Sequence, residues 1–281
     1  MSESARGKAA DAIFTAVAWL SGITGIALPL SILGYLAIEG ISAISWSFIA
    51  QPPRGFPLGS AGGIWPAIKG SLALVLGGLV IAFPCAVAGA IFLSEYRGNR
   101  AVVRILRFIG ELLASLPALI FGVWGFSFFV VACGLQLSLA AGMLTLAAVM
   151  FPIILLGSVA AFESLDLPTR EAALALGVSR SCLVRRILFR HGWPGILGAT
   201  VLAAGHAAGS AAPVLFTASV YLSSGDLKLS SPVMTLPTHL YHLVAEGISM
   251  EHAYATAFLL VAAILLANIA ATGLRHLGGR T

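Results

Sequence analysis

Charge is what this sequence lacks most. Only 10% of the 281 residues are Asp, Glu, Lys or Arg, whereas a water-soluble domain carries about 25%. Hydrophobic residues make up 59% of the chain, and the mean hydropathy is +0.98. This composition excludes a soluble domain and indicates an integral membrane protein.

Catalytic and cofactor motifs are also missing. The sequence has no G-x-x-x-x-G-K-[ST] phosphate-binding loop, and no acid–base or nucleophile set gathers in one segment. The acidic residues lie near the ends of apolar segments, which leaves no row of intramembrane carboxylates for proton coupling. Three cysteines, Cys85, Cys133 and Cys182, predict no disulfide framework. We therefore expect a chain that is not an enzyme and binds no metal or cofactor.

Long apolar runs are plentiful. Charge-poor segments that can cross ~30 Å of hydrocarbon lie at about 13–38, 70–94, 112–133, 139–161, 194–217 and 253–274. The third and fourth runs are divided at residues 133–136, where a glycine and a glutamine coincide. Residues 1–12 form a short polar leader, and the first run is too long for a signal peptide. The sequence predicts an all-α membrane protein with six transmembrane helices.

The basic residues predict the orientation. With the N-terminus in the cytoplasm, 13 of the 16 lysines and arginines fall on the inner side. The three outside are Arg54, Lys69 and Lys228. This distribution obeys the positive-inside rule and places both termini in the cytoplasm. The net charge of +5 therefore reflects topology and contact with membrane lipid, and we expect no nucleic-acid partner.

Residues 163–192 form a polar segment between the apolar runs of the second half. A helix is expected to start near Pro168, because proline fits a first turn, and to end at Gly177, which suits the left-handed position after a helix. A second short helix is expected at about 179–189. Its apolar and basic residues lie on opposite sides: Leu183, Ile187 and Leu188 against Arg185, Arg186 and Arg190. Such a pair of helices could dock on a partner, although basic loops are also common as plain connections.

This segment resembles the EAA loop of ABC-importer permeases. The resemblance rests on Glu171-Ala172-Ala173, then Gly177, then nine residues before Ile187. In that family the loop is a coupling helix that fits a cleft on the cytoplasmic ATPase. The family usually ends the motif with Ile-x-Leu-Pro, whereas this chain has Ile187-Leu188-Phe189-Arg190. The residues to which the resemblance assigns ATPase coupling are Glu171, Ala172, Ala173, Gly177, Arg185 and Arg186.

Further segments are similar to phosphate-importer permeases of the PstA type. They are a GGIWPAI entry at 62–68, an LSEY exit at 93–96 and an LP-x-H-x-Y stretch from Leu236. The resemblance implies a type I, MetI-like permease bundle in a bacterial inner membrane. It also implies a heterodimer with a second homologous permease, two ABC ATPase subunits that hold ATP and Mg, and an external substrate-binding protein.

The fifth run, at 194–217, is rich in small residues, and Gly205-x-x-x-Gly209 would permit close helix approach. His206 and Ser210 are four residues apart, on one face of a continuous helix. The stretch 205–213 resembles the family segment A-R-A-x-G-E-T-A-P, with His206 and Ser210 in place of its Arg and Glu. The resemblance implies a translocation pathway for a phosphate-like oxyanion here, whereas a packed neutral imidazole is the alternative.

Two other features leave alternatives open. Pro117 lies in a stretch similar to a family (L/V)PS-x-(I/V)-x-G element and predicts a bend beside the pathway, or simply a kinked packing helix. His239, His242 and Glu246 could suggest a metal site, but with no further ligand nearby we prefer an external amphipathic helix facing the binding protein.

Three functional hypotheses follow. The leading one is an importer permease for phosphate or a related oxyanion. Because the Arg and Glu are replaced, the variants of this hypothesis are a different substrate or impaired transport. A stand-alone transporter and a membrane-embedded enzyme are the remaining hypotheses.

Overall fold

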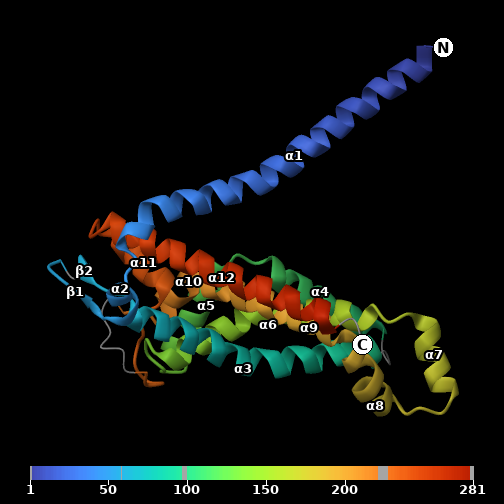
Figure 1. The fold of residues 1–281 in the computed structure, drawn as a ribbon. Coiled ribbons are helices and arrows are strands. Elements are labelled where there is room, and N and C mark those ends of the chain that lie inside the picture. The colour runs from blue at the N-terminus through green and yellow to red at the C-terminus, as the bar shows by residue number, and fades with distance from the viewer. Residues whose placement is uncertain (1, 58, 97–99, 221–226, 279–281) are drawn as a thin grey trace.

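The fold is almost entirely helical, and a computed structural model describes residues 2–57, 59–96, 100–220 and 227–278 (Figure 1). Arg97 and Arg280, both counted above as inner-side residues, lie outside this part. The first half contains α1 (Ser2–Gly40), η1 (Ile41–Ala43), α2 (Trp46–Ala50), β1 (Pro53–Arg54), β2 (Ala61–Gly62), α3 (Trp65–Glu95), α4 (Arg100–Ser115), α5 (Ala118–Gly125) and η2 (Phe126–Ala132). The second half contains α6 (Leu139–Glu163), α7 (Leu167–Ala175), α8 (Arg180–Cys182), η3 (Leu183–Leu188), α9 (Phe189–Gly209), α10 (Ala211–Thr217), α11 (Leu236–Ala245) and α12 (Met250–Gly278).

Four helices in the described residues are long and apolar enough to cross a membrane: α1, α3, α6 and α12. Two bent pairs raise the number to six if each pair is one span. The first pair joins α4 to α5 and η2 at an angle of 98°, and the second joins the α8–α9 helix to α10 at 62°. The membrane-protein fold predicted from the sequence is therefore present, with two of its runs broken.

Several predicted boundaries differ from the structure. Residues 2–12 of the predicted leader are part of α1, which is one helix from Ser2. The run predicted at 112–133 begins inside α4 and crosses a break after Ser115. The run predicted at 194–217 begins inside α9 and crosses a break at Ser210. Composition shows where lipid-compatible residues lie, but it does not show where a helix bends within them.

The division between the third and fourth runs is where the sequence placed it. The π-helical turn η2 ends at Ala132, and Gly134 and Gln136 both take positive φ angles, +69° and +56°. A positive φ is uncommon for a residue other than glycine and marks a tight turn. Ser138 then caps α6 by accepting a hydrogen bond from the Ala141 amide at 3.2 Å.

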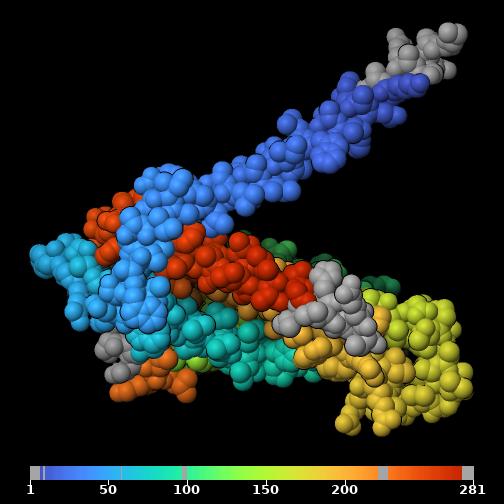
Figure 2. Space-filling model, viewed as in Figure 1, coloured from blue at the N-terminus to red at the C-terminus, as the bar shows by residue number. Residues whose placement is uncertain are grey.

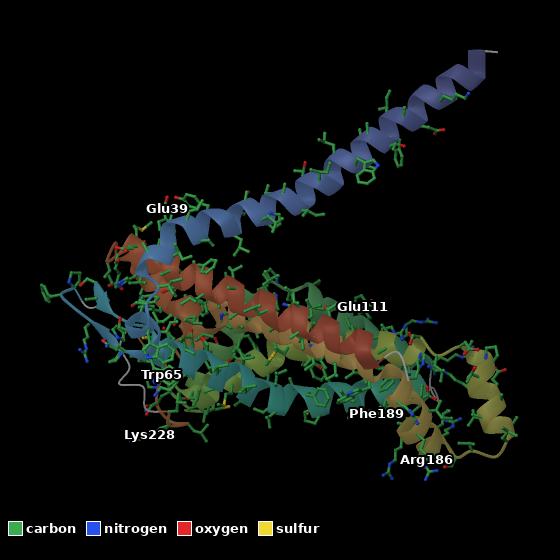
Figure 3. The ribbon with its side chains drawn as sticks, viewed as in Figure 1. Glu39, Trp65, Glu111, Arg186, Phe189 and Lys228 are labelled. Atoms are coloured by element: carbon green, nitrogen blue, oxygen red, sulfur yellow. The ribbon has the colours of Figure 1, made fainter. Side chains whose placement is uncertain are left out.

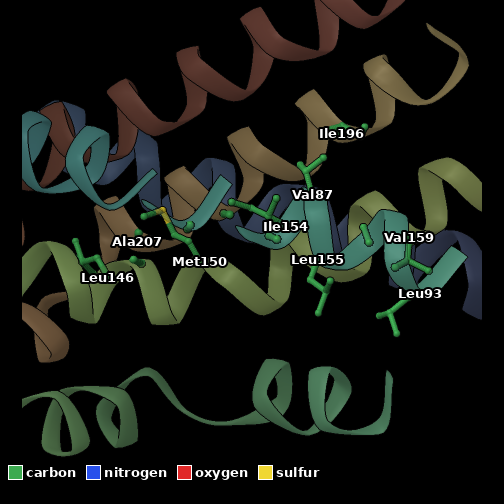
Figure 4. Packing of buried hydrophobic residues seen from close by; sticks show 14 of the residues in the cluster. Val87, Leu93, Leu146, Met150, Ile154, Leu155, Val159, Ile196 and Ala207 are labelled. Carbon is green, nitrogen blue, oxygen red and sulfur yellow. The ribbon is translucent and has the colours of Figure 1, made fainter. Parts of the chain in front are cut away.

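The core lies between α3 and α6, whose buried side chains interlock along most of their length (Figure 4). Met150 and Ile154 of α6 are fully buried there, and Val87 of α3 is 5% exposed. Gly78 allows the two helices to approach, because a Cβ at this position would lie 2.7 Å from the Met150 methyl group. The α3–α6 pair is therefore the frame on which the other helices pack.

A second close contact joins α6 to α9 through small residues. A Cβ on Gly157 of α6 would lie 2.3 Å from the Ala199 Cβ, and one on Gly195 of α9 would lie 2.7 Å from the Ala161 Cβ. Contacts this short are possible only without a side chain on one partner, as in membrane helix pairs generally.

The predicted Gly205-x-x-x-Gly209 motif does not form this contact between α6 and α9. A Cβ on Gly205 would meet Ile264 of α12 at 3.3 Å, and one on Gly209 would meet Ile264 at 3.6 Å. The first distance is tight and the second is ordinary van der Waals contact. The fifth run therefore does pack closely on a neighbour, but the closest approach is at Gly195 and not at Gly205 and Gly209.

The helix α1 stands apart from the bundle for most of its length (Figures 1 and 2). It meets α12 near its C-terminal end, where the Tyr35 and Tyr254 rings pack edge to face with centroids 5.6 Å apart and their hydroxyls 3.3 Å apart. The start of α1, the end of α12 and α7 lie toward one end of the molecule, and the β1–β2 hairpin lies at the other (Figure 1).

Candidate functional site

The helix α7 at the end of the bundle begins and stops where the sequence predicts. Asp166 caps its first turn by accepting a hydrogen bond from the Thr169 amide at 3.4 Å, and Pro168 stands in that turn. Hydrogen bonding from Thr169 lowers the pKa of the Asp166 carboxyl. At the other end the amides of Gly177 and Val178 donate to the carbonyls of Leu174 and Ala173, at 3.0 and 3.2 Å. Gly177 has a φ of +80°, so α7 ends in a Schellman motif.

Arg170 fastens α7 to the bundle. Its guanidinium pairs with Glu95, the last residue of α3, and both side chains are 9% exposed. It also donates to the carbonyl of Phe162, in the last turn of α6, and to that of Leu165, at 3.2 Å from Nε. These carbonyls lie at the end of α6, where a helix leaves acceptors without internal partners. One side chain therefore joins the ends of α3 and α6 to α7.

Sequence reasoning did not find this ion pair. It counted Arg170 only among the basic residues of the inner side, and it used Glu95 only as part of the LSEY exit at 93–96. The two residues are 75 positions apart, and neither spacing nor composition brings them together. The available signal was the arginine directly before the Glu171-Ala172-Ala173 motif, since a buried arginine needs a carboxylate partner.

The outer surface of α7 exposes both a carboxylate and leucines. Glu171 and Ala172 are exposed, whereas Ala173 is 9% exposed and packs on the bundle. Leu176 is 84% exposed, and Leu167 and Leu174 are 62% and 42% exposed. Exposed leucines on the polar segment at 163–192 are typical of a surface that contacts another protein. The sequence analysis assigned Glu171 to this surface but missed the leucines.

The second short helix predicted at 179–189 does not end at Phe189. Ser179 caps α8, and the chain continues through the π-helical turn η3 directly into α9, as one helical run from Arg180 to Gly209. The run stays continuous although Pro194 lies inside α9. The predicted separation of apolar and basic residues onto opposite sides is confirmed. Leu183 and Leu188 are buried, while Arg185, Arg186 and Arg190 are exposed.

The bend that the sequence analysis expected at Pro117 is present, as an angle of 98° between α4 and the α5–η2 helix, but it is a break between two helices and not a kink within one. Pro117 is the N-cap residue of α5, after α4 has already ended at Ser115. The short arm α5 packs against α10, where a Cβ on Gly122 would lie 3.0 Å from both the Ala212 carbonyl oxygen and the Pro213 Cα. Pro117 and Ser210 therefore each precede the short arm of a bent pair, and these two arms pack together.

His206 and Ser210 do not lie on one face of a continuous helix. His206 is in the last turn of α9, and Ser210 is the break between α9 and α10. The Ser210 hydroxyl donates to the His206 backbone carbonyl at 2.7 Å, which satisfies an acceptor at the end of the helix. The His206 side chain is exposed, whereas its neighbours Ala203 and Ala207 are 0% and 2% exposed. His206 therefore points away from the packed side of the bundle.

The predicted helix at 236–247 is α11, and it is amphipathic. Pro237, Thr238, His239 and Leu243 are buried, while Tyr241 on the other side is 51% exposed. His242 contacts Glu246 through Nδ1 and Oε1 at 3.2 Å. Burial, followed by the nearby charges of His252 and His242, lowers the pKa of His239 from 6.5 to about 4.

The His239→Gln variant should have a flatter pH profile of stability. The unfolded chain binds a proton at pH 6.5 and the folded chain only near pH 4, so stability is full above pH 6.5 and falls as the pH drops toward 4. Wild-type protein should lose about 2 kcal/mol from this residue between pH 8 and 5. Thermal unfolding of both proteins in detergent across that range measures the difference. Parallel profiles would contradict a buried, neutral His239.

Comparison with known proteins identifies the family. The family model of binding-protein-dependent transport system inner membrane components matches residues 86–277. The probable ABC transporter permease protein YqgI of Bacillus subtilis is 28% identical over 94% of this chain and 94% of that protein. The phosphate transport system permease protein PstA of Haemophilus influenzae is 30% identical over 93% of this chain and 92% of that protein.

Solved structures show the same fold. A bacterial alginate ABC transporter, in complex with a periplasmic protein bound to alginate pentasaccharide, matches with a TM-score of 0.65 and 16% identity over 98% of this chain and 96% of that chain. The inward-facing MetNI methionine ABC transporter matches with a TM-score of 0.62 and 21% identity over 77% of this chain and 94% of that chain. The chain therefore belongs to the binding-protein-dependent transport system inner membrane components, the non-catalytic permease subunits of ABC importers, and is related to phosphate permeases of the PstA type.

Proposed function

We propose that this protein is a transmembrane subunit of an ATP-driven importer for phosphate or a related oxyanion, and that α7 couples it to a cytoplasmic ATPase. The observation that carries the proposal is the position of α7, which exposes Glu171 and Leu176 to a partner while Arg170 fixes the helix to α3 and α6. A force that the partner applies to α7 is thereby transmitted to both α3 and α6. ATP and Mg would be held by the ATPase.

In the proposed orientation, α7 and both termini face the cytoplasm of a bacterial cell, with the protein in the inner membrane. Arg186 and Phe189 lie at one end of the bundle, and Trp65 and Lys228 lie at the other (Figure 3). The Lys69 ammonium sits over the Trp65 ring, 5.6 Å from its centroid, as expected for a lysine at an interface. The arginine-rich end is the inner side by the positive-inside rule.

A second permease is expected to cover α1 and the His206 side of α9. Apolar residues are exposed around α1, among them Phe14, Trp19 and Ile26, at 76%, 70% and 67%. Lipid can cover such a helix, but an imidazole facing lipid is costly. His206 therefore favours a protein neighbour or an aqueous pathway on this side. A heterodimer with two ATPases and an external binding protein would complete the importer.

Phosphate is the leading substrate because relatives named PstA match most of the chain. His206 and Ser210 supply hydrogen-bonding groups where the family segment A-R-A-x-G-E-T-A-P has an arginine and a glutamate, and a guanidinium would supply a permanent charge. The Ser210 hydroxyl is already used by the His206 carbonyl. This difference supports an alternative, in which the permease imports another substrate or has impaired transport.

The Leu176→Ser variant tests coupling. Leu176 is 84% exposed, so its replacement should leave the bundle folded while it removes part of the proposed ATPase contact. We expect the reconstituted assembly to lose at least roughly tenfold in anion-stimulated ATP hydrolysis, as a leucine buried in an interface contributes about 1.5–3 kcal/mol. The readout is hydrolysis with phosphate, sulfate or molybdate supplied with the binding protein.

Leu227→Ser is the matched control, because Leu227 is 46% exposed and lies outside α7. Equal loss in both variants, or uptake without any ATPase, would refute coupling through α7. The anion that stimulates hydrolysis most identifies the substrate, and stimulation by none of the three would refute the oxyanion assignment while leaving the coupling result intact.

A further inference from the structure

A histidine side chain ties the β1–β2 hairpin to α12 at the end of the molecule opposite α7 (Figure 1). The His252 Nδ1 nitrogen lies 2.9 Å from the Gly59 carbonyl oxygen and donates to it, because a carbonyl can only accept. The His252 ring also packs on Phe48 of α2, with the ring centroids 5.1 Å apart. Protonation of His252 would keep this hydrogen bond, since Nδ1 carries a hydrogen in the imidazolium as well.

The base of the hairpin is attached by other bonds. The Ile64 amide, directly after the hairpin, donates to the Phe48 carbonyl at 2.8 Å, and the Trp65 amide donates to the Gln51 carbonyl at 3.1 Å. These bonds do not involve Gly59. Loss of the contact at Gly59 would therefore free the turn of the hairpin while its base stays in place.

A second histidine is buried where this turn meets α11. His239 is 7% exposed, and its Cε1 atom lies 4.0 Å from the position that a Cβ would take on Gly59. Leu243, one turn later on α11, lies 3.3 Å from the same position and is 1% exposed. Gly59 is itself buried. The turn therefore covers this side of α11, and lifting it would bring water to His239 and Leu243.

The titratable groups that act on His239 are positive when they are charged. They are His252 of α12 and His242 of α11, and α10, which also packs on α11, has no titratable residue. The charged side chains of the hairpin, α3, α11 and α12 at this end are exposed or contact another group: Arg54, Lys69, Glu246 and Glu251. Burial, followed by the charges of His252 and His242, lowers the pKa of His239 to about 4.

Proton uptake therefore favours an open hairpin. Under the closed turn His239 has a pKa of about 4, whereas in water its pKa would return to 6.5. The closed form is fully stable above pH 6.5 and loses stability as the pH falls toward 4, because the open form binds the proton more tightly. With these two values, the equilibrium constant for opening rises about 30-fold between pH 8 and pH 5.

We propose that Gly59, His239 and His252 form an acid-sensitive latch, which holds the β1–β2 hairpin closed on α11 and α12 in neutral solution and releases it in acid. His239 takes up the proton that opens the latch, and His252 supplies the hydrogen bond that keeps it closed. The inference rests on the proposed function only for the compartment that the latch faces. In the proposed orientation this is the outer side, where a binding protein would dock.

The reactivity of a cysteine under the turn tests the latch. Leu243→Cys is introduced into the full chain together with Cys85→Ser, Cys133→Ser and Cys182→Ser, and the protein is placed in phosphatidylcholine nanodiscs. Its reaction with dithiodipyridine, which also modifies thiols in acid, is followed between pH 8 and pH 5. Each rate is divided by that of Val244→Cys, which is 50% exposed, so that the titration of the thiol cancels. We expect this ratio to rise about 30-fold from pH 8 to pH 5.

Two variants separate the roles of the histidines. With His239→Gln the ratio should stay flat, because glutamine does not titrate. With His252→Ala it should already be about fivefold higher at pH 8, because the hairpin has lost one hydrogen bond. A flat ratio in the chain that keeps both histidines would overturn the latch, and so would an unchanged 30-fold rise with His239→Gln.

Leu139→Cys is the control for wider unfolding, because Leu139 is 3% exposed at the start of α6, away from the hairpin contact. Its reactivity, divided in the same way, should not change with pH. An equal rise at Leu139 and Leu243 would overturn the latch in favour of a general loosening of the fold. The measurement uses neither the ATPase nor a binding protein, so failure of the latch would leave the proposed function untouched.

Discussion

Replacing Arg170 by methionine is expected to cost about 3–5 kcal/mol in the free energy of unfolding, because it leaves the Glu95 carboxylate buried without its partner. The variant also removes the donors to the Phe162 and Leu165 carbonyls at the end of α6. Denaturation of the full chain in detergent measures the loss. We expect transport to disappear with it, because α7 would no longer be fixed to α3.

Arg107→Met is the matched control. Arg107 also pairs with a glutamate, donating to Glu163 at 2.6 Å, but the two side chains are 37% and 32% exposed. An exposed pair contributes at most about 1 kcal/mol. The double variant Glu95→Met/Arg170→Met should regain most of the lost stability, since apolar residues can replace a buried pair. Equal losses for Arg170→Met and Arg107→Met would show that burial of the first pair does not matter.

The second large effect is expected at the contact between α6 and α9. Gly157→Ala would place a Cβ 2.3 Å from that of Ala199, so the helices must separate or bend. Overpacking of this kind costs roughly 1–3 kcal/mol. The exchange Gly157→Ala/Ala199→Gly keeps the number of methyl groups constant and should restore stability. Thermal unfolding of the single and double variants measures this recovery.

Gly209→Ala serves as the control for that series. A Cβ there would meet Ile264 at an ordinary 3.6 Å, and alanine favours a helix over glycine by about 1 kcal/mol. Its stability should equal or exceed that of the wild type. A loss at Gly209 as large as that at Gly157 would restore the predicted Gly205-x-x-x-Gly209 motif as the close contact.

Local rules explain what the sequence could predict. Pro168 and Gly177 carry strong conformational preferences, and the observed ends of α7 follow them. The turn near Gln136 was found for the same reason, as a polar residue beside a glycine interrupts an apolar run. The apolar and the basic side of the Arg180–Phe189 segment were predicted from helical periodicity alone. In each case the signal and the structure it determines lie within a few residues of each other.

The rest depends on contacts between distant segments. The Arg170–Glu95 pair requires the ends of α3 and α7 to meet, which no local pattern encodes. Pro117 permits either a kink or a break, and the packing of α5 on α10 accompanies the break. Ser210 shows the same ambiguity, because small residues suit both a continuous helix and a bent one. The coupling role of α7 remains a prediction for the Leu176→Ser variant, and the translocation role of His206, Ser210 and Pro117 stays a prediction.

The position of α1 has a consequence for biosynthesis. Tyr35 and the residues after it meet Tyr254 and Ala255 of α12, which leaves the ribosome long after α1. Throughout translation the first helix therefore sits in the bilayer before its contact on α12 exists. A neighbouring subunit can reach it during that interval, so pairing of subunits need not wait for chain termination.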